Sequence, residues 1–484
     1  MARLCMVFPQ AESARPWGVL YNLPWVMLVL VQSMPAAVVA VPASEEGSAP
    51  SSDDGSSHPG CGLEATIRHN LIVESLYSAF TGIFMGMILF AAPVIACTTL
   101  NASTTELTII VSAFPCGAFM GPLWAGLGRR WGMKSLVLTM AVLANLPLLL
   151  MFLVSDSAVF TALITISQLL HSAMRMGQSS MYRASYPRSY LGRVLGWLTF
   201  CTFATMVPTT LLAGWLAKPE VMPSSYQWLY PLAAVAGLVG CLFYRRLRLL
   251  EQPPAASAPG SITESLAGIR KVLFSDRAYM FFQMAFFLSG SAFFLSMHIT
   301  LKLSKDRLNL SPAELALWLA VLPQIVLALS TLAWGHFLNR LGIVRARLII
   351  GLIMTIYLSC YFGGITLGLP VLIWCGSILR GLAEGGGQVT WALASVHFAP
   401  RSEDVPMYNG IHFVLNGIRG LIMPAVGTVL FLATGQWTIL MAAGIAAGSI
   451  LVIVFSLRYG EGPVSSALPS KVDTHHPEPE LEAA

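Results

Sequence analysis

The sequence predicts an all-α membrane protein of twelve transmembrane helices, arranged as two pseudo-symmetric six-helix bundles and preceded by an extra apolar N-terminal segment. Three observations carry this prediction: an apolar composition, many apolar segments of spanning length, and an internal repeat. The 484 residues are 56% hydrophobic and 11% charged, whereas soluble domains average about 25% charged residues. A water-soluble fold could not bury so much apolar surface, so we expect lipid to be the solvent.

Segments long enough to cross a bilayer fill the body of the chain. A spanning helix needs about 20 mostly apolar residues, and the ends of predicted helices are placed to within about 2–4 residues. The predicted spans are 70–97, 104–128, 134–154, 157–181, 190–216, 227–248, 277–302, 312–338, 345–366, 369–396, 406–434 and 437–457. They predict an N-terminal bundle (69–248), a cytoplasmic linker (249–276), a C-terminal bundle (277–458) and a disordered cytoplasmic tail (459–484).

A repeated sequence motif indicates that the two bundles arose by duplication. Residues 101–107 (NASTTEL) reappear as 309–315 (NLSPAEL), and each copy opens a long apolar segment. In both copies a serine is followed three positions later by a glutamate, the spacing of a capping box that starts a helix. Both are also N-x-S sequons, but the helix-entry interpretation is the stronger one. Duplicated membrane bundles are typical of transporters in which one half moves against the other around a central site.

The distribution of basic residues orients the chain. The turns on one side hold eighteen lysines and arginines and those on the other side hold four. By the positive-inside rule, the linker and the C-terminus face the cytoplasm. We therefore expect a multi-pass protein of the cell (cytoplasmic or inner) membrane.

The N-terminal extension, residues 1–68, fits this scheme poorly. Its apolar stretch 17–41 is interrupted by Pro24 and Pro35, and an acidic, Ser/Gly-rich segment follows that is expected to be disordered. A signal peptide, a thirteenth span, an interfacial segment and an unneeded upstream start remain open.

Two loops resemble a family signature. Residues 125–134 (AGLGRRWGMK) are similar to the loop G-x-L-A-D-R-x-G-R-K of the major facilitator superfamily, and residues 335–342 (GHFLNRLG) are the second-half counterpart. Residues 408–410 (YNG) and 417–420 (GIRG) are similar to a mostly uncharacterised bacterial group. The resemblance implies two six-helix bundles and alternating access, with a gating loop at Arg129, Arg130, Gly132, Asn339, Arg340 and Gly342.

This loop also departs from the family. Arg129 and Asn339 stand where relatives carry an acid of the cytoplasmic gate. The gate must then close by other contacts, and coupling to protons is less assured than in those relatives.

Polar side chains recur at helical spacing on four predicted spans. Polar groups are costly at membrane depth and mark cavities or internal pairs, and these stripes lie on spans that line the cavity in the resembled family. The expected substrate-binding residues are Gln168, His171, Arg175, Gln178, Arg380, Gln388, Trp391, His412, Asn416 and Arg419.

Charged members of these stripes predict the chemistry. Arg175, Arg380 and Arg419 could grip an anion, because a guanidinium stays charged and offers a rigid fork of donors. Alternatively, Arg380 and Glu384 are spaced i,i+4 and neutralise each other. Glu74 and Glu384 are the expected proton-coupling acids, and Glu74 has no local cation in its span.

The leading hypothesis is therefore a secondary active or facilitative transporter of a small polar, anionic organic solute. The alternatives are multidrug-type efflux of amphipathic compounds and a non-transporting sensor or scaffold of the same fold. The apolar walls of an efflux site would be Trp391, Phe282, Phe286 and Met284. No nucleophile–base pair, metal cluster or cofactor motif indicates an enzyme, so no cofactor or metal is expected. The expected partners are the solute, the bilayer and protons, with no nucleic acid, and a monomer suffices.

Overall fold

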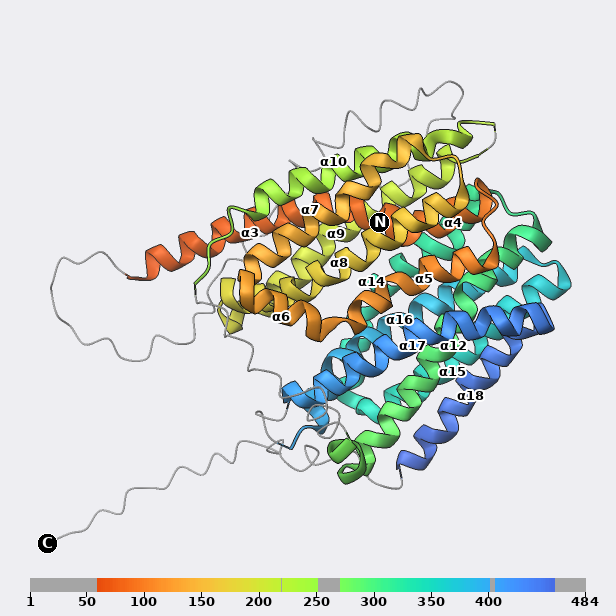
Figure 1. The fold of residues 1–484 in the computed structure, drawn as a ribbon. Coiled ribbons are helices and arrows are strands. Elements are labelled where there is room, and N and C mark those ends of the chain that lie inside the picture. Colours follow the sequence, from red (N-terminus) through yellow and green to blue (C-terminus); the bar gives the residue numbers. More distant parts are fainter. Residues whose placement is uncertain (1–58, 219, 251–269, 401–404, 458–484) are drawn as a thin grey trace, which may run out of the picture. The chain divides into compact units, whose positions relative to one another are not determined.

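The computed structural model describes residues 59–218, 220–250, 270–400 and 405–457, and every regular element within these ranges is a helix (Figure 1). The apolar stretch 17–41, most of the linker 249–276 and the tail 459–484 lie outside the described residues. The first helix starts earlier than the predicted residue 70. It begins at Pro59, and residues 63–77 contain neither proline nor glycine that would interrupt it.

The described residues fall into two compact units. The first unit contains the segment before Ala102 together with Met120–Ser257. Its first crossing is one continuous rod of α3 (Pro59–Met85), the π-helical turn η1 (Gly86–Ala91) and α4 (Ala92–Thr98). The remaining elements are α6 (Gly121–Trp131), α7 (Met133–Leu149), η2 (Leu150–Leu153), α8 (Ser157–Ser185), α9 (Arg188–Leu216), η3 (Pro223–Ser225) and α10 (Tyr226–Tyr244).

The second unit contains Ser103–Phe119 and the chain from Ala258 onward. Figure 1 shows α12, α15, α17 and α18 of this unit running side by side. Its elements are α5 (Thr104–Phe119), α12 (Arg277–Leu308), α13 (Pro312–Leu315), η4 (Ala316–Val321), α14 (Leu322–Leu341), α15 (Ile343–Leu367), α16 (Pro370–Phe398), α17 (Val405–Thr434) and α18 (Trp437–Ser456).

Ten of the described helical segments are long and apolar enough to cross a membrane. The shorter apolar helix α5 and the 29-residue helix α16 come in addition to these ten, which is consistent with the predicted twelve-helix architecture. The bundle boundaries 69–248 and 277–458 stay a prediction. One difference is that the second span is broken at Met120, where α5 ends and α6 begins.

Both copies of the repeated sequence motif form the capping box that the sequence predicts. The Ser103 backbone N–H donates to a carboxylate oxygen of Glu106 at 2.6 Å, and the Glu106 N–H donates to the serine hydroxyl at 3.2 Å. Ser311 and Glu314 make the same pair of bonds at 2.7 and 3.3 Å. The repeated sequence motif thus starts a helix in each half of the chain.

Helix α5 packs along α17 of the second unit. The contact is close at two glycines of α17: a Cβ on Gly420 would overlap Pro115 of α5, and a Cβ on Gly417 would crowd Phe119. Small residues at such interfaces let helix backbones approach, which favours association inside a membrane where the hydrophobic effect does not act.

Candidate functional site

In the first unit, part of the predicted stripe on α8 is directed into the bundle. Gln168 is buried and its Nε2 donates to the Ile88 carbonyl of η1 at 2.6 Å. The buried His171 ring lies 5.2 Å, centroid to centroid, from the ring of Phe84. These two residues pack α8 against the first crossing, where Gln168 satisfies a carbonyl in the irregular π-helical turn.

Arg175 differs from them because its side chain is exposed. Its Nη1 donates to Oε1 of Gln178, one turn further along α8, at 3.3 Å. A charged side chain held by a neutral amide keeps its charge available to a ligand. Of the four predicted residues on α8, Arg175 is the exposed one, whereas Gln168, His171 and Gln178 are buried.

Glu74 of α3 is fully buried, at 0% exposure. Neither of its carboxyl oxygens has a hydrogen-bond partner among the described residues. The hydroxyl of Tyr186 is close to this carboxyl, but no bond of normal length joins them, and the hydroxyl of Tyr244 is also nearby and unbonded. Among the described residues no cation pairs with Glu74, so it lies in the bundle as an unpaired acid beside the Tyr186 and Tyr244 hydroxyls.

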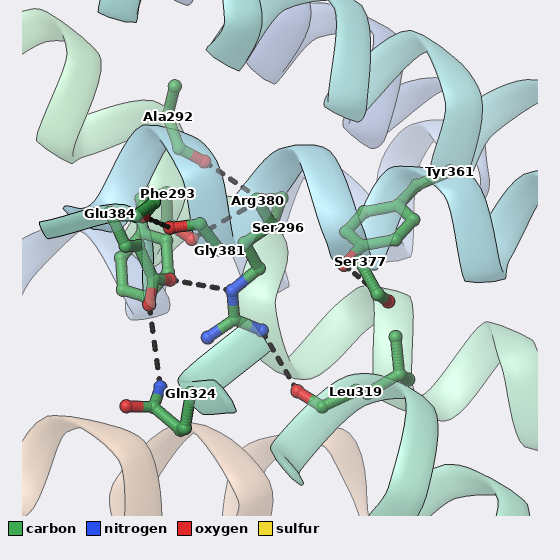
Figure 2. A network of polar contacts seen from close by, with 11 residues as sticks. Ala292, Phe293, Ser296, Leu319, Gln324, Tyr361, Ser377, Arg380, Gly381 and Glu384 are labelled. Carbon is green, nitrogen blue, oxygen red and sulfur yellow. Dashed lines mark hydrogen bonds and ion pairs between the residues drawn. The ribbon is translucent and has the colours of Figure 1, made fainter. Parts of the chain in front are cut away.

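In the second unit, Arg380 of α16 is neutralised within the protein. Figure 2 shows its guanidinium between Glu384 and Leu319: Nε donates to the Glu384 carboxylate at 2.6 Å and Nη1 to the Leu319 carbonyl at 3.1 Å. Its guanidinium carbon lies 5.0 Å from the centroid of the Phe293 ring. Gln324 donates to the other Glu384 oxygen at 3.4 Å. The i,i+4 pair predicted as an alternative is therefore formed.

Arg419 of α17 is buried without a carboxylate partner in the described part of the chain. Its Nε and Nη2 both donate to Oδ1 of Asn416, at 3.1 and 2.7 Å, and its Nη1 donates to the backbone carbonyl of Phe286. The guanidinium carbon lies 4.4 Å from the centroid of the Phe286 ring. Gly290 of α12 makes room for it, because a Cβ there would overlap the guanidinium.

A second arginine on the same ring was missed by the sequence analysis. Arg347 of α15 was counted among the arginines of the cytoplasmic turns, yet it is buried, and its guanidinium carbon lies 4.3 Å from the Phe286 centroid. Its Nη2 donates to the hydroxyl of Ser289. The available signal was its place five residues after Gly342, already one turn inside an apolar helix.

The other predicted residues of α16 and α17 lie around this ring or at the surface. The buried His412 ring is 4.4 Å from Phe286 and 5.9 Å from Trp391, and its Nδ1 lies 3.0 Å from Oε1 of Gln283. Gln388 is exposed. Arg347, Arg419 and His412 with Phe286 are hereafter called the Phe286 cluster.

The predicted gating loops share one backbone feature. Gly132 and Gly342, which end α6 and α14, have φ angles of 81° and 75°, a region that favours glycine. Arg130 and Arg340 are exposed. The side chains of Arg129 and Asn339 lie outside the described part of the structure, so the absent gate acids stay a sequence observation.

Comparisons with known proteins agree with this architecture. The family profile described as Major Facilitator Superfamily matches residues 75–404 and 305–481. The crystal structure of the nucleoside transporter NupG superposes with a TM-score of 0.61 at 16% identity, over 81% of this chain and 99% of that chain. The D-xylose-proton symporter gives 0.60 at 13% identity, over 82% and 98%. At such identities the likeness shows the fold alone. No curated protein sequence matches the chain.

Proposed function

Since the chain belongs to the Major Facilitator Superfamily, a family of transporters and not of enzymes, we propose that it moves a small polar, anionic organic solute across the cell membrane by alternating access. In this proposal the C-terminus is cytoplasmic, as the positive-inside bias predicts. The transporter is secondary active or facilitative, with protons as the candidate coupling ion.

One observation carries the anionic assignment: the buried Arg419 has only neutral partners among the described residues. A buried charge is costly unless it is paired. Within the described ranges Arg380 is paired with Glu384, whereas no acid pairs with Arg419. An anionic solute would supply the missing charge, and this makes Arg419 the main candidate among the three predicted arginines.

Glu74 supports coupling to protons. It is buried and has no cation partner among the residues that the structure describes, and a solved protein of the same fold is named a proton symporter. Glu384 is a weaker candidate, because its carboxylate is engaged by Arg380.

A neutral polar solute is the second candidate. The solved neighbours are named for a nucleoside and for D-xylose, and three donors of Arg419 already bind within the protein. In that case the arginine would brace α12 against α17 and leave recognition to amide and hydroxyl groups.

The test is uptake by proteoliposomes holding the purified full chain, with a panel of labelled carboxylates and phosphate esters and their neutral analogues. We expect saturable uptake of an anionic member, lost in Arg419→Gln. Arg277→Gln, which changes an exposed arginine at the start of α12, is the control. Uptake of neutral analogues alone, unchanged in Arg419→Gln, would reject the anionic assignment.

A further inference from the structure

The Phe286 cluster holds two positive charges on one aromatic ring. The guanidinium carbons of Arg347 and Arg419 lie 4.3 and 4.4 Å from the Phe286 centroid. The two residues are 5% and 6% exposed, and no carboxylate pairs with either in the described residues. The like charges of the two guanidinium groups repel each other, and burial raises the cost of each. In the part of the chain that the structure describes, Arg380 is neutralised by Glu384, whereas this pair has no counter-charge.

Most N–H donors of Arg347 and Arg419 have no hydrogen-bond partner among the described residues. A guanidinium has five N–H donors. Arg419 uses three of them on Asn416 and Phe286, which fix its orientation. Arg347 uses one, on Ser289. Arg419 is therefore held in a fixed orientation, whereas most N–H donors of Arg347 have no partner among the described residues. The pair can thus bind a group that has several acceptor oxygens.

Two further polar atoms, one on His412 and one on its neighbour Gln283, have no hydrogen bond of normal length among the described residues. Gln283 and His412 are each 2% exposed. Because the amide oxygen of Gln283 can only accept, Nδ1 of His412 donates to it, at 3.0 Å. This leaves Nε2 of His412 as an acceptor, buried and unbonded within the described residues. The amide nitrogen of Gln283 is a donor with the Tyr279 hydroxyl close by, but no bond of normal length joins them. Buried orphan groups of this kind require a water or a ligand.

We propose that the Phe286 cluster binds a phosphoryl group and that Arg347 is a ligand-binding residue. A phosphate monoester carries about −1.5 to −2 charges near neutral pH and three strong acceptor oxygens. It balances both guanidinium groups, whereas a single carboxylate leaves one of them uncompensated. The free donors of Arg347 take the phosphoryl oxygens, and Gln283 and His412 take an ester oxygen and a hydroxyl of the remainder.

As an assignment of substrate class, this inference rests on the proposed function, and it narrows the anionic solute to a phosphorylated one. The headgroup of phosphatidic acid presents the same chemistry, so the source of the phosphoryl group is decided by experiment.

The binding test uses the purified full chain with inorganic phosphate as the probe. Thermal unfolding is followed against phosphate concentration at constant ionic strength, with chloride as the replacement anion. A ligand that binds only the folded state raises the melting temperature. We expect a saturable rise with phosphate, at least tenfold weaker in apparent affinity for Arg347→Gln and unchanged for Arg345→Gln, an exposed arginine two positions away.

If Arg347→Gln does not fold, Arg347→Lys compared with Arg345→Lys decides. Lysine keeps the charge but loses the fork of donors, so the same tenfold weakening is expected at position 347 only. No phosphate-dependent shift in the parent, or an equal shift in the Arg347 variants, overturns the proposal.

Two further experiments distinguish a lipid headgroup from a soluble phosphate ester, and the phosphoryl assignment from the transport proposal. In nanodiscs of phosphatidylcholine, added phosphatidic acid abolishes the phosphate response if the headgroup occupies the site, and leaves it intact if a soluble ester does. Phosphate binding that depends on Arg347, without anion uptake by proteoliposomes, keeps the site and removes the transport proposal. Uptake of a carboxylate that depends on Arg419, without phosphate binding, keeps transport and removes the phosphoryl assignment.

Discussion

Asn101 and Asn309 adopt the same left-handed backbone conformation, with φ angles of 50° and 51°. Asn309 ends α12, and Ser311 caps the next helix two residues later. The repeated sequence motif therefore both ends one helix and starts the next. This explains the asparagine: it tolerates the left-handed region better than other residues with a side chain.

Replacing Asn309 separates backbone conformation from side-chain contacts. We expect Asn309→Ala to destabilise the protein by about 1 kcal/mol, since alanine pays the left-handed penalty. Asn309→Gly should match or exceed the parent, because glycine adopts this region freely. Thermal unfolding of the two variants in one detergent provides the comparison. Equal melting temperatures for both would show that the backbone conformation is not what matters here.

The Arg380–Glu384 pair is expected to be structural. Glu384→Gln leaves a buried guanidinium unpaired, which typically costs about 3 kcal/mol or more, and replacing both residues by methionine should recover much of that loss. The control is Asp306→Asn, which breaks the exposed i,i+4 pair with Lys302 and should cost about 0–1 kcal/mol. A Glu384→Gln protein as stable as the parent, with uptake that no longer responds to a proton gradient, would instead assign coupling to Glu384.

Glu74→Gln tests coupling at the buried acid of the first unit. Glutamine keeps the shape and removes the ionisable group, so we expect folding to be retained. Uptake driven by an imposed proton gradient should fall to the rate seen without a gradient, while exchange of solute across the membrane continues. Glu64→Gln changes an exposed acid on the same helix and should behave as the parent. A full gradient response in Glu74→Gln would exclude this residue as the proton carrier.

Local patterns in the sequence predicted those features that depend on local spacing. The capping boxes at Ser103 and Ser311 and the possible Arg380–Glu384 pair follow from residues three or four positions apart. The role of Arg347 did not follow, because counting basic residues cannot separate a loop from the first turns of a helix. Its contact with Phe286 joins positions 61 residues apart in the chain, and only packing of α15 on α12 creates it.

A hydroxyl cluster joins α5 to two helices of the second unit. Thr108 bonds the hydroxyl of Thr428, and Nε2 of His298 lies 2.9 Å from the Thr428 hydroxyl and 3.3 Å from that of Thr108. Interhelical hydrogen bonds within membranes contribute about 0.6 kcal/mol on average. We expect Thr108→Val and Thr428→Val each to lower stability by about this amount, and the double variant to lose less than the sum, because they share one network. Additive losses in thermal unfolding would mean that the two hydroxyls act separately.

Gly427 and Gly410 of α17 offer a matched pair of substitutions. A Cβ on Gly427 would overlap the backbone carbonyl of Leu295 on α12, whereas a Cβ on Gly410 meets nothing within 4 Å. Alanine is favoured over glycine in a helix by about 1 kcal/mol, so Gly410→Ala should be neutral or stabilising. Gly427→Ala must push two backbones apart, and overpacking of this kind costs about 1–3 kcal/mol. Melting temperatures that rise for both variants would contradict the close approach of α12 and α17.

The same pair of variants should also differ in anion uptake. Arg419 lies on α17 and reaches the Phe286 carbonyl of α12, so the separation of these helices should weaken anion uptake in Gly427→Ala. Anion uptake should stay intact in Gly410→Ala.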